Sequence, residues 1–450
     1  MENLEETNTT VTSIEKSAVS EDRFVQKQDD MVLARLIQRM NNMYAFTLYG
    51  NSAIILKTDE EEIKFLPETT FLSLVRNQWY YSKKDEKNKQ IGPTWLCSEE
   101  RRSYSDVVFY PGTLEDKKIF NLWRGFSYRP LQGDCSLFLD HIRANICAGN
   151  EKNYEWLLDW MADAVQKPFR KNWTAVLMES KEEGTGKGFF AGHFGKLFGR
   201  HYAAYNKPKQ LLGQFNSHLE DKLIVFLDEG SLIEKNAYDY AKSLITEPTL
   251  NIEPKGRSMR EVKSYHRIIM ASNDRHILRS SIYDRRWMVL RVAPNSVNNL
   301  NYFKAIETQL ESGGYEALMY MLVNRKYDEN SVKTIVKTDA LTYQKEQNLP
   351  EFLQWWRGCL LSGVIGDAAT DWPPFILPSE LYASYINWCE RMKVNKRESC
   401  DWLPRRLNEE SGMSFRRVTL HSQRVYELPE LDECRRLFDE KLGYQTDWEE

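Results

Sequence analysis

Residues 182–190 read EEGTGKGFF and follow the short apolar run TAVLM at 174–178. A strand, a glycine-rich turn and a helix N-terminus place backbone N–H groups and the helix dipole where phosphate oxygens can bind. Two positions differ from a standard P-loop, because Lys181 replaces its first glycine and Gly188 replaces its Ser or Thr hydroxyl. A glycine turn without a ligand explains this stretch, taken alone, about equally well. The candidate phosphate-binding residues are Gly184, Thr185, Gly186, Lys187 and Gly188.

Two later apolar runs end in polar residues that suit nucleotide chemistry. KLIVFLDEG ends in Asp228 and Glu229, and RIIMASND carries Asn273. A strand-end Asp can hold Mg²⁺, a following Glu can act as general base for a water, and a carboxamide can orient that water. Each feature alone is more often an ordinary turn or strand end. Because all three follow Lys187 in order and at close spacing, we expect an ATP site with Mg²⁺.

Arginine and lysine residues gather in two segments after the acidic pair. Arg285 and Arg286, in SSIYDRRWMV, precede an apolar run and suit an arginine finger that acts on a neighbouring subunit. Salt bridges with Asp284 are the alternative. EPKGRSMREVKSYHR at 253–267 would present a positive loop to single-stranded DNA, and a solvated charged loop is the alternative. The cations of this segment are Lys255, Arg257, Arg260, Lys263 and Arg267.

Composition places the chain among soluble globular proteins, and its 450 residues suffice for two or three domains. The formal charge of −4 means that nucleic-acid binding must rest on local clusters. Seven cysteines without a C-x-x-C pair indicate neither a zinc site nor a disulfide framework. No apolar run approaches the roughly 18–20 residues of a membrane helix, and MENLEETNTT lacks the features of a signal peptide. We expect a cytoplasmic protein without a membrane partner.

The expected fold class is α/β. Short apolar runs alternate with helical segments between 171 and 330, which favours a mostly parallel sheet flanked by helices. The first residues are too polar to bury a core, so we expect a disordered tail there. The expected parts are the tail at 1–22, a small α+β domain at 23–130, a helical segment at 131–170, the α/β domain at 171–330 and a helical domain at 331–450.

The last part has the element order of a winged-helix module. FLQWWRGCLL, SELYASYINWCERM and CDWLPRRLNEE have helical spacing, and FRRVTLHSQRVYEL alternates like a hairpin. Three helices followed by a hairpin are typical of this relative of the helix-turn-helix. Protein contacts are nearly as well supported a role for the module as DNA binding. The candidate DNA contacts are Arg405, Arg406, Arg416 and Arg417.

Several motifs occur in one order: NLWRGF, YEWLLDWMADAVQKP, GTGKGFF, GQFNSHLEDKLIVFLDE and DRRW. This combination resembles superfamily 3 helicases, the ring-forming AAA+ ATPases of viruses and plasmids. More narrowly, it is similar to the helicase part of phage and mobile-element primase-helicases, which include primase-polymerase-associated and poxvirus primase-helicase-like proteins. The similarity covers about residues 95–294. This group often has Gly after the P-loop Lys, as this chain has Gly188, but that Gly is typically followed by Thr, where this chain has Phe189.

The resemblance implies an AAA+ P-loop ATPase core with a small N-terminal domain, a helical collar at 131–170 and a winged-helix-like C-terminal domain. It also implies a homo-oligomeric ring, expected to be a hexamer. The basic segment at 253–267 would then contact DNA inside the ring. The implied roles are phosphate binding for Lys187, Mg²⁺ binding for Asp228, water activation for Glu229, sensing for Asn273 and a finger for Arg285 or Arg286.

The implied function is an ATP-dependent DNA helicase that translocates on single-stranded DNA and unwinds forked DNA. It would serve replication of a phage or mobile element in the cytoplasm of a bacterial host. The residues before the similar part are too few for a typical polymerase domain, so we expect a separate primase or polymerase as partner. Two alternatives stay open. One is a replication initiator or DNA-remodelling ATPase with hydrolysis weakened by Gly188, and the other is a non-catalytic DNA-binding scaffold.

Overall fold

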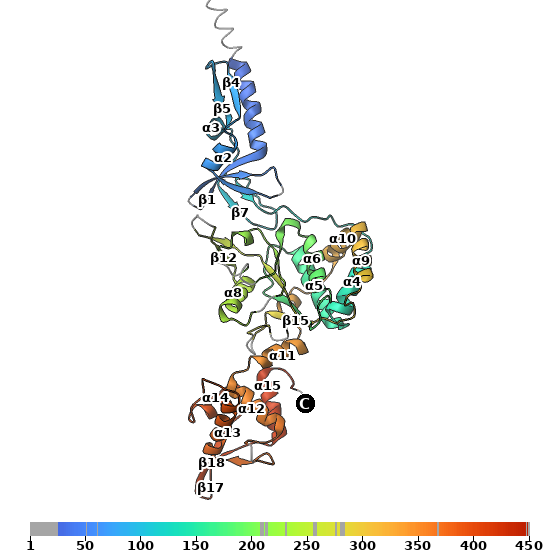
Figure 1. Cartoon of the computed structure of the whole chain (residues 1–450), viewed down its shortest axis with the longest axis vertical. Coiled ribbons are helices and arrows are strands. Elements are labelled where there is room, and N and C mark those ends of the chain that lie inside the picture. The colour runs from blue at the N-terminus through green and yellow to red at the C-terminus, as the bar shows by residue number, and fades with distance from the viewer. Residues whose placement is uncertain are drawn as a thin grey trace, which may run out of the picture.

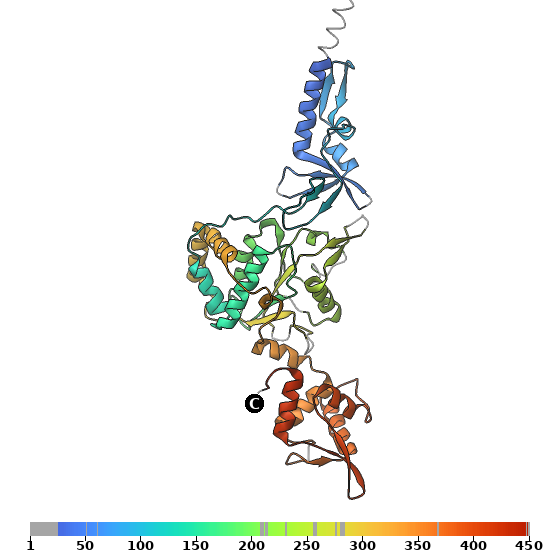
Figure 2. The same cartoon turned by 180° about the vertical axis from the view of Figure 1, so that it is seen from behind.

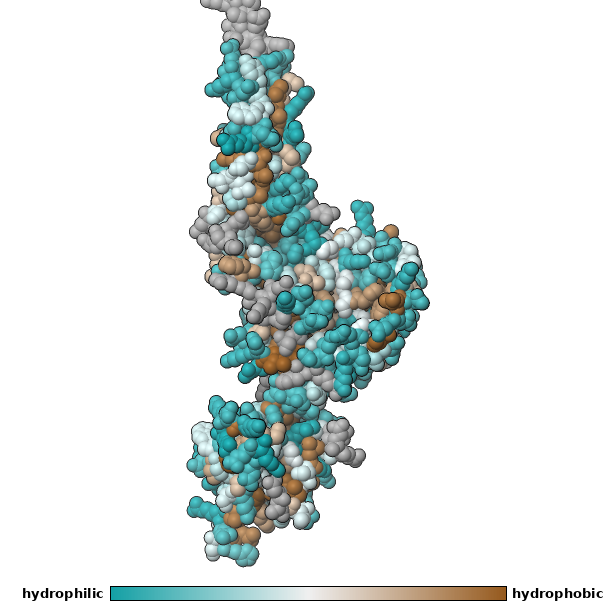
Figure 3. Space-filling view, viewed as in Figure 1, coloured by the Kyte–Doolittle hydropathy of each residue, from teal (hydrophilic) through white to brown (hydrophobic). Residues whose placement is uncertain are grey.

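The computed structural model forms three bodies stacked along one axis (Figure 1), and Figure 2 shows the same arrangement from behind. Hydrophilic residues cover most of the face drawn in Figure 3, and hydrophobic residues form small patches on it. The described part of the chain contains no helix with the length and apolar character that a membrane crossing needs. The tail predicted at 1–22 lies outside it, as do Lys255 and Arg257. The structure describes residues 26–50, 52–60, 62–207, 211, 215–229, 232–254, 259–274, 277–279, 284–366, 369–446 and 448.

A small sheet and a long helix build the N-terminal body. β1 (Tyr44–Tyr49) and β2 (Ser52–Lys57) pair antiparallel around Gly50, which confirms the predicted hairpin. The helix over residues 26–43 shares a buried cluster with α2 (Glu68–Leu74) and α3 (Ile91–Leu96). The remaining strands are β3 (Lys64–Pro67), β4 (Trp79–Ser82), β5 (Lys87–Gln90), β6 (Ser103–Tyr104), β7 (Asp106–Val108) and β8 (Ile119–Asn121).

Five parallel strands form the sheet of the central body, in the order β10-β11-β14-β9-β15. Every residue of β9, β11 and β14 is buried, as expected for a parallel sheet covered on both faces. The predicted mixed α/β architecture is therefore present, and the four predicted strands are confirmed. The short edge strand β10 was not predicted. The strands are β9 (Ala175–Glu179), β10 (Tyr202–Tyr205), β11 (Ile224–Leu227), β14 (Arg267–Ser272) and β15 (Trp287–Arg291).

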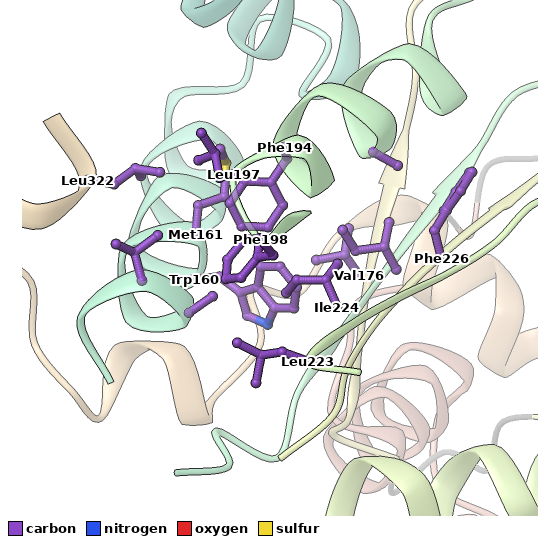
Figure 4. Packing of buried hydrophobic residues seen from close by; sticks show 14 of the residues in the cluster. Trp160, Met161, Val176, Phe194, Leu197, Phe198, Leu223, Ile224, Phe226 and Leu322 are labelled. Carbon is purple, nitrogen blue, oxygen red and sulfur yellow. The ribbon is translucent and has the colours of Figure 1, made fainter. Parts of the chain in front are cut away.

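Side chains of the central sheet alternate between two apolar layers. One layer joins Val176 and Ile224 to Trp160 of α5 (Glu151–Gln166) and Phe194 of α6 (Lys187–Lys196), and Figure 4 shows this packing. The other layer lies against α8 (Lys235–Thr246). The helical part of the first layer also contains α4 (Ser136–His141), η1 (Ile142–Ile146), α9 (Leu300–Gln309), η4 (Leu310–Gly314) and α10 (Tyr315–Asn324).

The C-terminal body has its own buried core, which begins at Leu349. Its three predicted helices and the following hairpin are present, and β16 and the last helix are additions to that pattern. α11 (Asp339–Gln347) belongs to the predicted C-terminal part, but it buries Ala340 and Leu341 in the second layer of the central body. The C-terminal elements are α12 (Glu351–Ser362), β16 (Phe375–Ile376), α13 (Pro378–Arg391), α14 (Leu403–Glu410), β17 (Arg416–Leu420), β18 (Gln423–Glu427) and α15 (Leu431–Leu442).

Arg267 contradicts its predicted role as a DNA contact. It closes a run of cations in the sequence, but it is the first residue of β14 and its side chain is 0% exposed. Its guanidinium donates to Asp163 Oδ2 of α5 at 2.6 Å. Burial alone would raise the pKa of Asp163, but the charge and hydrogen bonds of Arg267 and its neighbours hold that pKa below its usual range. Arg267 therefore joins α5 to the central sheet.

Replacing Arg267 by Ala removes the cation that pairs with Asp163 Oδ2 and leaves the carboxylate buried. We expect Arg267→Ala to lower the free energy of unfolding by about 3–5 kcal/mol. Lys263→Ala, at an exposed site on the strand that precedes β14, is the control and should change it by less than about 0.5 kcal/mol. Urea unfolding followed by circular dichroism measures both. A loss below about 1 kcal/mol for Arg267→Ala would contradict a structural role.

Candidate functional site

The predicted nucleotide residues meet at the carboxyl edge of the central sheet. β14 lies between β9 and β11, and the register pairs Ser272 with Glu179 and Met270 with Leu227. Because the three strands are parallel, the glycine-rich loop, Asp228 and Asn273 follow strand ends that lie side by side. Residues that are far apart in the sequence thus reach one place through the strand order alone.

The glycine-rich loop has a conformation that requires glycine at Gly186. Its φ of 93° lies in the left-handed region, and Gly184 has a φ of 69°. A Cβ on Gly186 would lie 2.6 Å from His141 Nε2 and 3.0 Å from Phe303 Cε1. Gly186 is also the N-cap of α6, and within the described residues no side chain caps this helix. The first N–H groups of α6 therefore remain available to a ligand, which favours a built loop over a chance run of glycines.

Lys187 points its amine at the end of β14. The side chain is buried, and Nζ donates to Asn273 Oδ1 at 2.8 Å and to Ser180 Oγ. Burial lowers the pKa of Lys187, while the negative charge of Asp228 opposes that shift. Since hydroxyl and amide oxygens hold the amine in place, Lys187 presents an oriented donor at the edge of the sheet.

A cavity of about 360 Å³ opens in front of this amine. Such a volume lies within the range of small-molecule sites. Asp228 is half-buried at its wall, Glu229 is exposed, and the ring centroids of Phe189 and Phe303 lie 4.9 Å apart on its apolar side. The cavity therefore combines donors, carboxylates and an aromatic surface. Its lining residues are Glu183, Gly184, Thr185, Gly186, Lys187, Gly188, Phe189, Asp228, Glu229, Asn273 and Phe303.

His141 supports the loop from behind and is absent from the predicted site. Its Nδ1 lies 3.1 Å from Tyr302 Oη, and its Nε2 lies 3.4 Å from the carbonyl oxygen of Gly186. Burial lowers the pKa of His141 to about 4, so the ring is neutral at pH 7. In the sequence this histidine sits in an ordinary amphipathic stretch, LDHIRANI, far from the glycines. Only the tertiary packing of α4 and α9 around the loop reveals it.

Arg285 and Arg286 lie at the amino ends of the parallel strands, whereas the cavity lies at their carboxyl ends. They precede β15, whose residue Trp287 pairs with Ala175 at the start of β9. A strand of this length spans about 16 Å, so neither arginine lines the cavity of its own chain. Arg285 is exposed, whereas Arg286 forms the alternative ion pair with Asp284 at 3.3 Å.

The described part of the basic segment contains β13 (Arg260–Lys263), which pairs antiparallel with the preceding strand β12 (Thr249–Ile252) in what we call the basic hairpin. Arg260 contradicts its prediction as a free DNA contact, because its side chain is only 13% exposed. Its guanidinium donates to Glu220 and to the carbonyl oxygen of Val107 at 2.9 Å, and it lies 4.0 Å from the ring centroid of Tyr49. Lys263 is exposed, so it stays a predicted DNA contact.

The C-terminal arginines divide into exposed and paired side chains. Arg405 and Arg416 are exposed and stay predicted DNA contacts, although Arg416 also lies 3.7 Å from Glu427 Oε2. Arg417 is also exposed, and it donates to Tyr426 Oη at 3.0 Å. Arg406 instead bridges Glu398 and Glu410, the second at 2.7 Å. Its guanidinium is thus engaged within the fold, and its DNA contact stays a prediction.

Comparison with known proteins identifies a phage replication protein as a homologue. Over 236 residues the chain is 27% identical to the DNA primase-polymerase of Nitratiruptor phage NrS-1. The matched region covers 49% of this chain and 32% of that protein. The chain therefore spans about a third of the length of this relative. A family profile described as a family of unknown function, DUF5906, matches residues 178–286. That range contains the whole glycine-rich loop, the acidic pair, Asn273 and both arginines.

Solved structures of the NrS-1 C-terminal region share the fold of this chain. One apo structure aligns with a TM-score of 0.63 at 16% identity and covers 86% of this chain and 95% of that chain. A second apo structure, the A form, aligns with a TM-score of 0.64 at 16% identity and covers 87% and 98%. The common fold thus extends well beyond the range of the family profile.

The packing behind the loop predicts that Gly186 tolerates no side chain. We expect Gly186→Ala to lower the free energy of unfolding by about 1–3 kcal/mol, because it adds a left-handed alanine and a clash with His141. Gly192→Ala, in the same helix and with open space around the added Cβ, is the control and should stabilise by about 0.5–1 kcal/mol. Urea unfolding separates the two variants. Equal stability would mean that the loop does not adopt this turn.

Proposed function

We propose that this chain is an ATP-driven DNA helicase of the superfamily 3 type, built on an AAA+ P-loop core and acting in phage DNA replication. The observation that carries the proposal is the contact of Lys187 Nζ with Asn273 at 2.8 Å, in front of a cavity that Asp228 and Glu229 also line. A loop donor, an acidic strand end and a carboxamide strand end are the parts that phosphoryl transfer requires. Homology to a phage replication protein supports the biological setting.

The donors around the cavity fit a triphosphate. The N–H groups at the start of α6 and the amine of Lys187 would bind phosphate oxygens. Glu229 is exposed beside Asp228, where it can accept a proton from a water. Asn273 can orient that water only if its contact with Lys187 relaxes, since the same Oδ1 accepts from the amine. The aromatic pair of Phe189 and Phe303 offers a surface for the base.

The acidic residues fit Mg²⁺ in the form that keeps several water ligands. Among the described residues there is no cluster of three or more His, Cys, Asp or Glu that could hold a metal ion. Mg²⁺ is commonly held by one or two carboxylates together with phosphates and waters, and Asp228 would supply the carboxylate here. When bound, the ion would neutralise charge on the phosphates.

Assembly in a ring is the proposed source of the arginine finger. Arg285 is exposed at the sheet edge that faces away from its own cavity, so its guanidinium can serve a neighbouring subunit. The exposed Lys263 on the basic hairpin is available to single-stranded DNA. The primase and polymerase activities named for the relative are not part of this proposal, because the match covers 32% of that protein.

A replication initiator or remodelling ATPase with weak hydrolysis is the second candidate, and Gly188 favours it. This residue lines the cavity where a P-loop has a hydroxyl ligand for Mg²⁺. A Cβ added at Gly188 would lie 3.8 Å from Asp228 Oδ2, which is ordinary van der Waals contact. A hydroxyl would therefore fit beside the acidic residue, and its absence is not forced by crowding.

ATP hydrolysis by the full chain, with and without single-stranded DNA and over a range of protein concentrations, tests the proposal. We expect turnover to rise with both DNA and protein concentration, because the finger comes from a second subunit. Lys187→Ala should lower turnover about a hundredfold or more. The control is Lys181→Ala, an exposed lysine of the same loop that does not line the cavity. Turnover that survives Lys187→Ala would sink the assignment of the site.

Gly188→Ser tests whether the missing hydroxyl limits hydrolysis. A serine oxygen beside Asp228 adds a ligand for Mg²⁺, so we expect the Mg²⁺ concentration for half-maximal turnover to fall roughly fivefold, as a contribution of about 1 kcal/mol would give. Gly188→Ala adds the same Cβ without the hydroxyl and is the matched control. Titration of turnover with Mg²⁺ measures both variants. Equal curves for Ser and Ala would show that the hydroxyl plays no part.

A further inference from the structure

The hairpin of β4 and β5 exposes two large aromatic side chains next to each other. Trp79 is 57% exposed and Tyr81 is 56% exposed. They occupy positions i and i+2 of β4, so both rings lie on one face of the ribbon, about 6.7 Å apart along the strand. Figures 1 and 2 show this hairpin at the end of the N-terminal body that lies away from the central body.

The other face of β4 fixes the orientation of these rings. Ser82 is buried, and its Oγ donates to Asp29 Oδ2 of the helix over 26–43 at 2.9 Å. Asp29 also accepts the backbone N–H groups of Lys83 and Lys84 at 2.9 and 2.7 Å. Since alternate residues of a strand face opposite sides, this clamp holds Trp79 and Tyr81 outward. The ribbon that carries the two rings is therefore held by the helix, and the rings face away from it.

The neighbours of the rings suit the edges of nucleic-acid bases. The register of β4 and β5 places Gln90 opposite Trp79 and Asn88 opposite Tyr81. Both neighbours are uncharged amides; Gln90 Nε2 donates to the carbonyl oxygen of Arg76 at 3.3 Å, and its Oε1 can still accept a hydrogen bond. A ring face flanked by amides, without a cross-strand charge, favours stacking with a flat polar ligand.

Lysine side chains at the tip of the β4–β5 hairpin can attract the phosphates of a nucleic acid. Lys83, Lys84 and Lys87 are exposed there. Glu86 opposes them at the tip, whereas Asp85 is paired with Lys89 and with Ser82. The exposed charge at the tip is thus positive, although the chain as a whole carries −4.

We propose that the face of Trp79, Tyr81, Asn88 and Gln90, with the lysines of the tip, binds single-stranded nucleic acid by stacking bases on the two rings. Stacking on exposed aromatics beside positive charge is a sequence-independent mode of single-strand recognition. The site lies on the N-terminal body, which Arg260 of the basic hairpin contacts. A nucleic-acid strand bound to this face would therefore lie on the same side of the central body as the basic hairpin. Binding at this face requires neither ATP nor the cavity around Lys187.

Fluorescence anisotropy of a labelled oligo(dT) with the full chain, in the absence of ATP, tests the site. Trp79→Ala with Tyr81→Ala should weaken binding at least about tenfold, because each stacked base is worth roughly fivefold to a hundredfold. Trp79→Phe with Tyr81→Phe keeps two rings and should restore most of the affinity. The control is Trp173→Ala, a tryptophan of the central body with 49% exposure. Lys83→Gln with Lys84→Gln should reduce the salt dependence of binding by about one to two phosphate contacts.

Photocrosslinking with a bromodeoxyuridine oligonucleotide gives a second measurement that does not depend on other DNA contacts. We expect an adduct on the peptide that contains Trp79 and Tyr81. Unchanged affinity together with no adduct on this peptide would overturn the proposal. If the alanine variant instead sediments as a smaller species, the aromatic face is a contact between copies and the proposal is also wrong. ATP turnover without DNA should stay unchanged in these variants, which separates failure of this site from failure of the proposed function.

Discussion

The position of β14 between β9 and β11 is the constraint on which the central body depends. At its start, Arg267 is held by Asp163 of α5, with neither side chain exposed. At its end, Asn273 meets the amine of Lys187. One buried strand thus connects the ion pair at its amino end to the candidate site at its carboxyl end. Because every residue of β14 is buried, this connection cannot shift without disturbing both apolar layers.

The sequence predicts the features that depend on local pattern. The strands before Lys187, Asp228 and Asn273 are apolar runs that end in polar residues, and parallel pairing brings such ends together. The hairpin at Gly50 and the C-terminal order of helices and hairpin also follow from local signals. These predictions are confirmed as elements of structure. The ATP chemistry assigned to them stays a prediction.

Features that depend on long-range packing could not be predicted in the same way. Arg260 and Arg267 look alike in a run of cations. In the structure Arg260 contacts Glu220 and the N-terminal body, whereas Arg267 contacts Asp163 of α5. A charge run predicts an exposed surface, and only tertiary contact shows which of its members are buried. His141 gives no signal, because its role is to fill the space behind Gly186.

The side chain of Arg260 ties the basic hairpin to Glu220 of the central body and to two residues of the N-terminal body. Arg260 belongs to the hairpin, while Val107 of β7 and Tyr49 of β1, which it contacts, belong to the N-terminal body. Glu220 is buried, and its Oε2 also accepts from Tyr49 Oη at 2.5 Å. Pulling the hairpin away would leave this carboxylate buried without its cation, at a cost of several kcal/mol. One guanidinium therefore acts as a joint that holds the N-terminal body against the central body, because it contacts both.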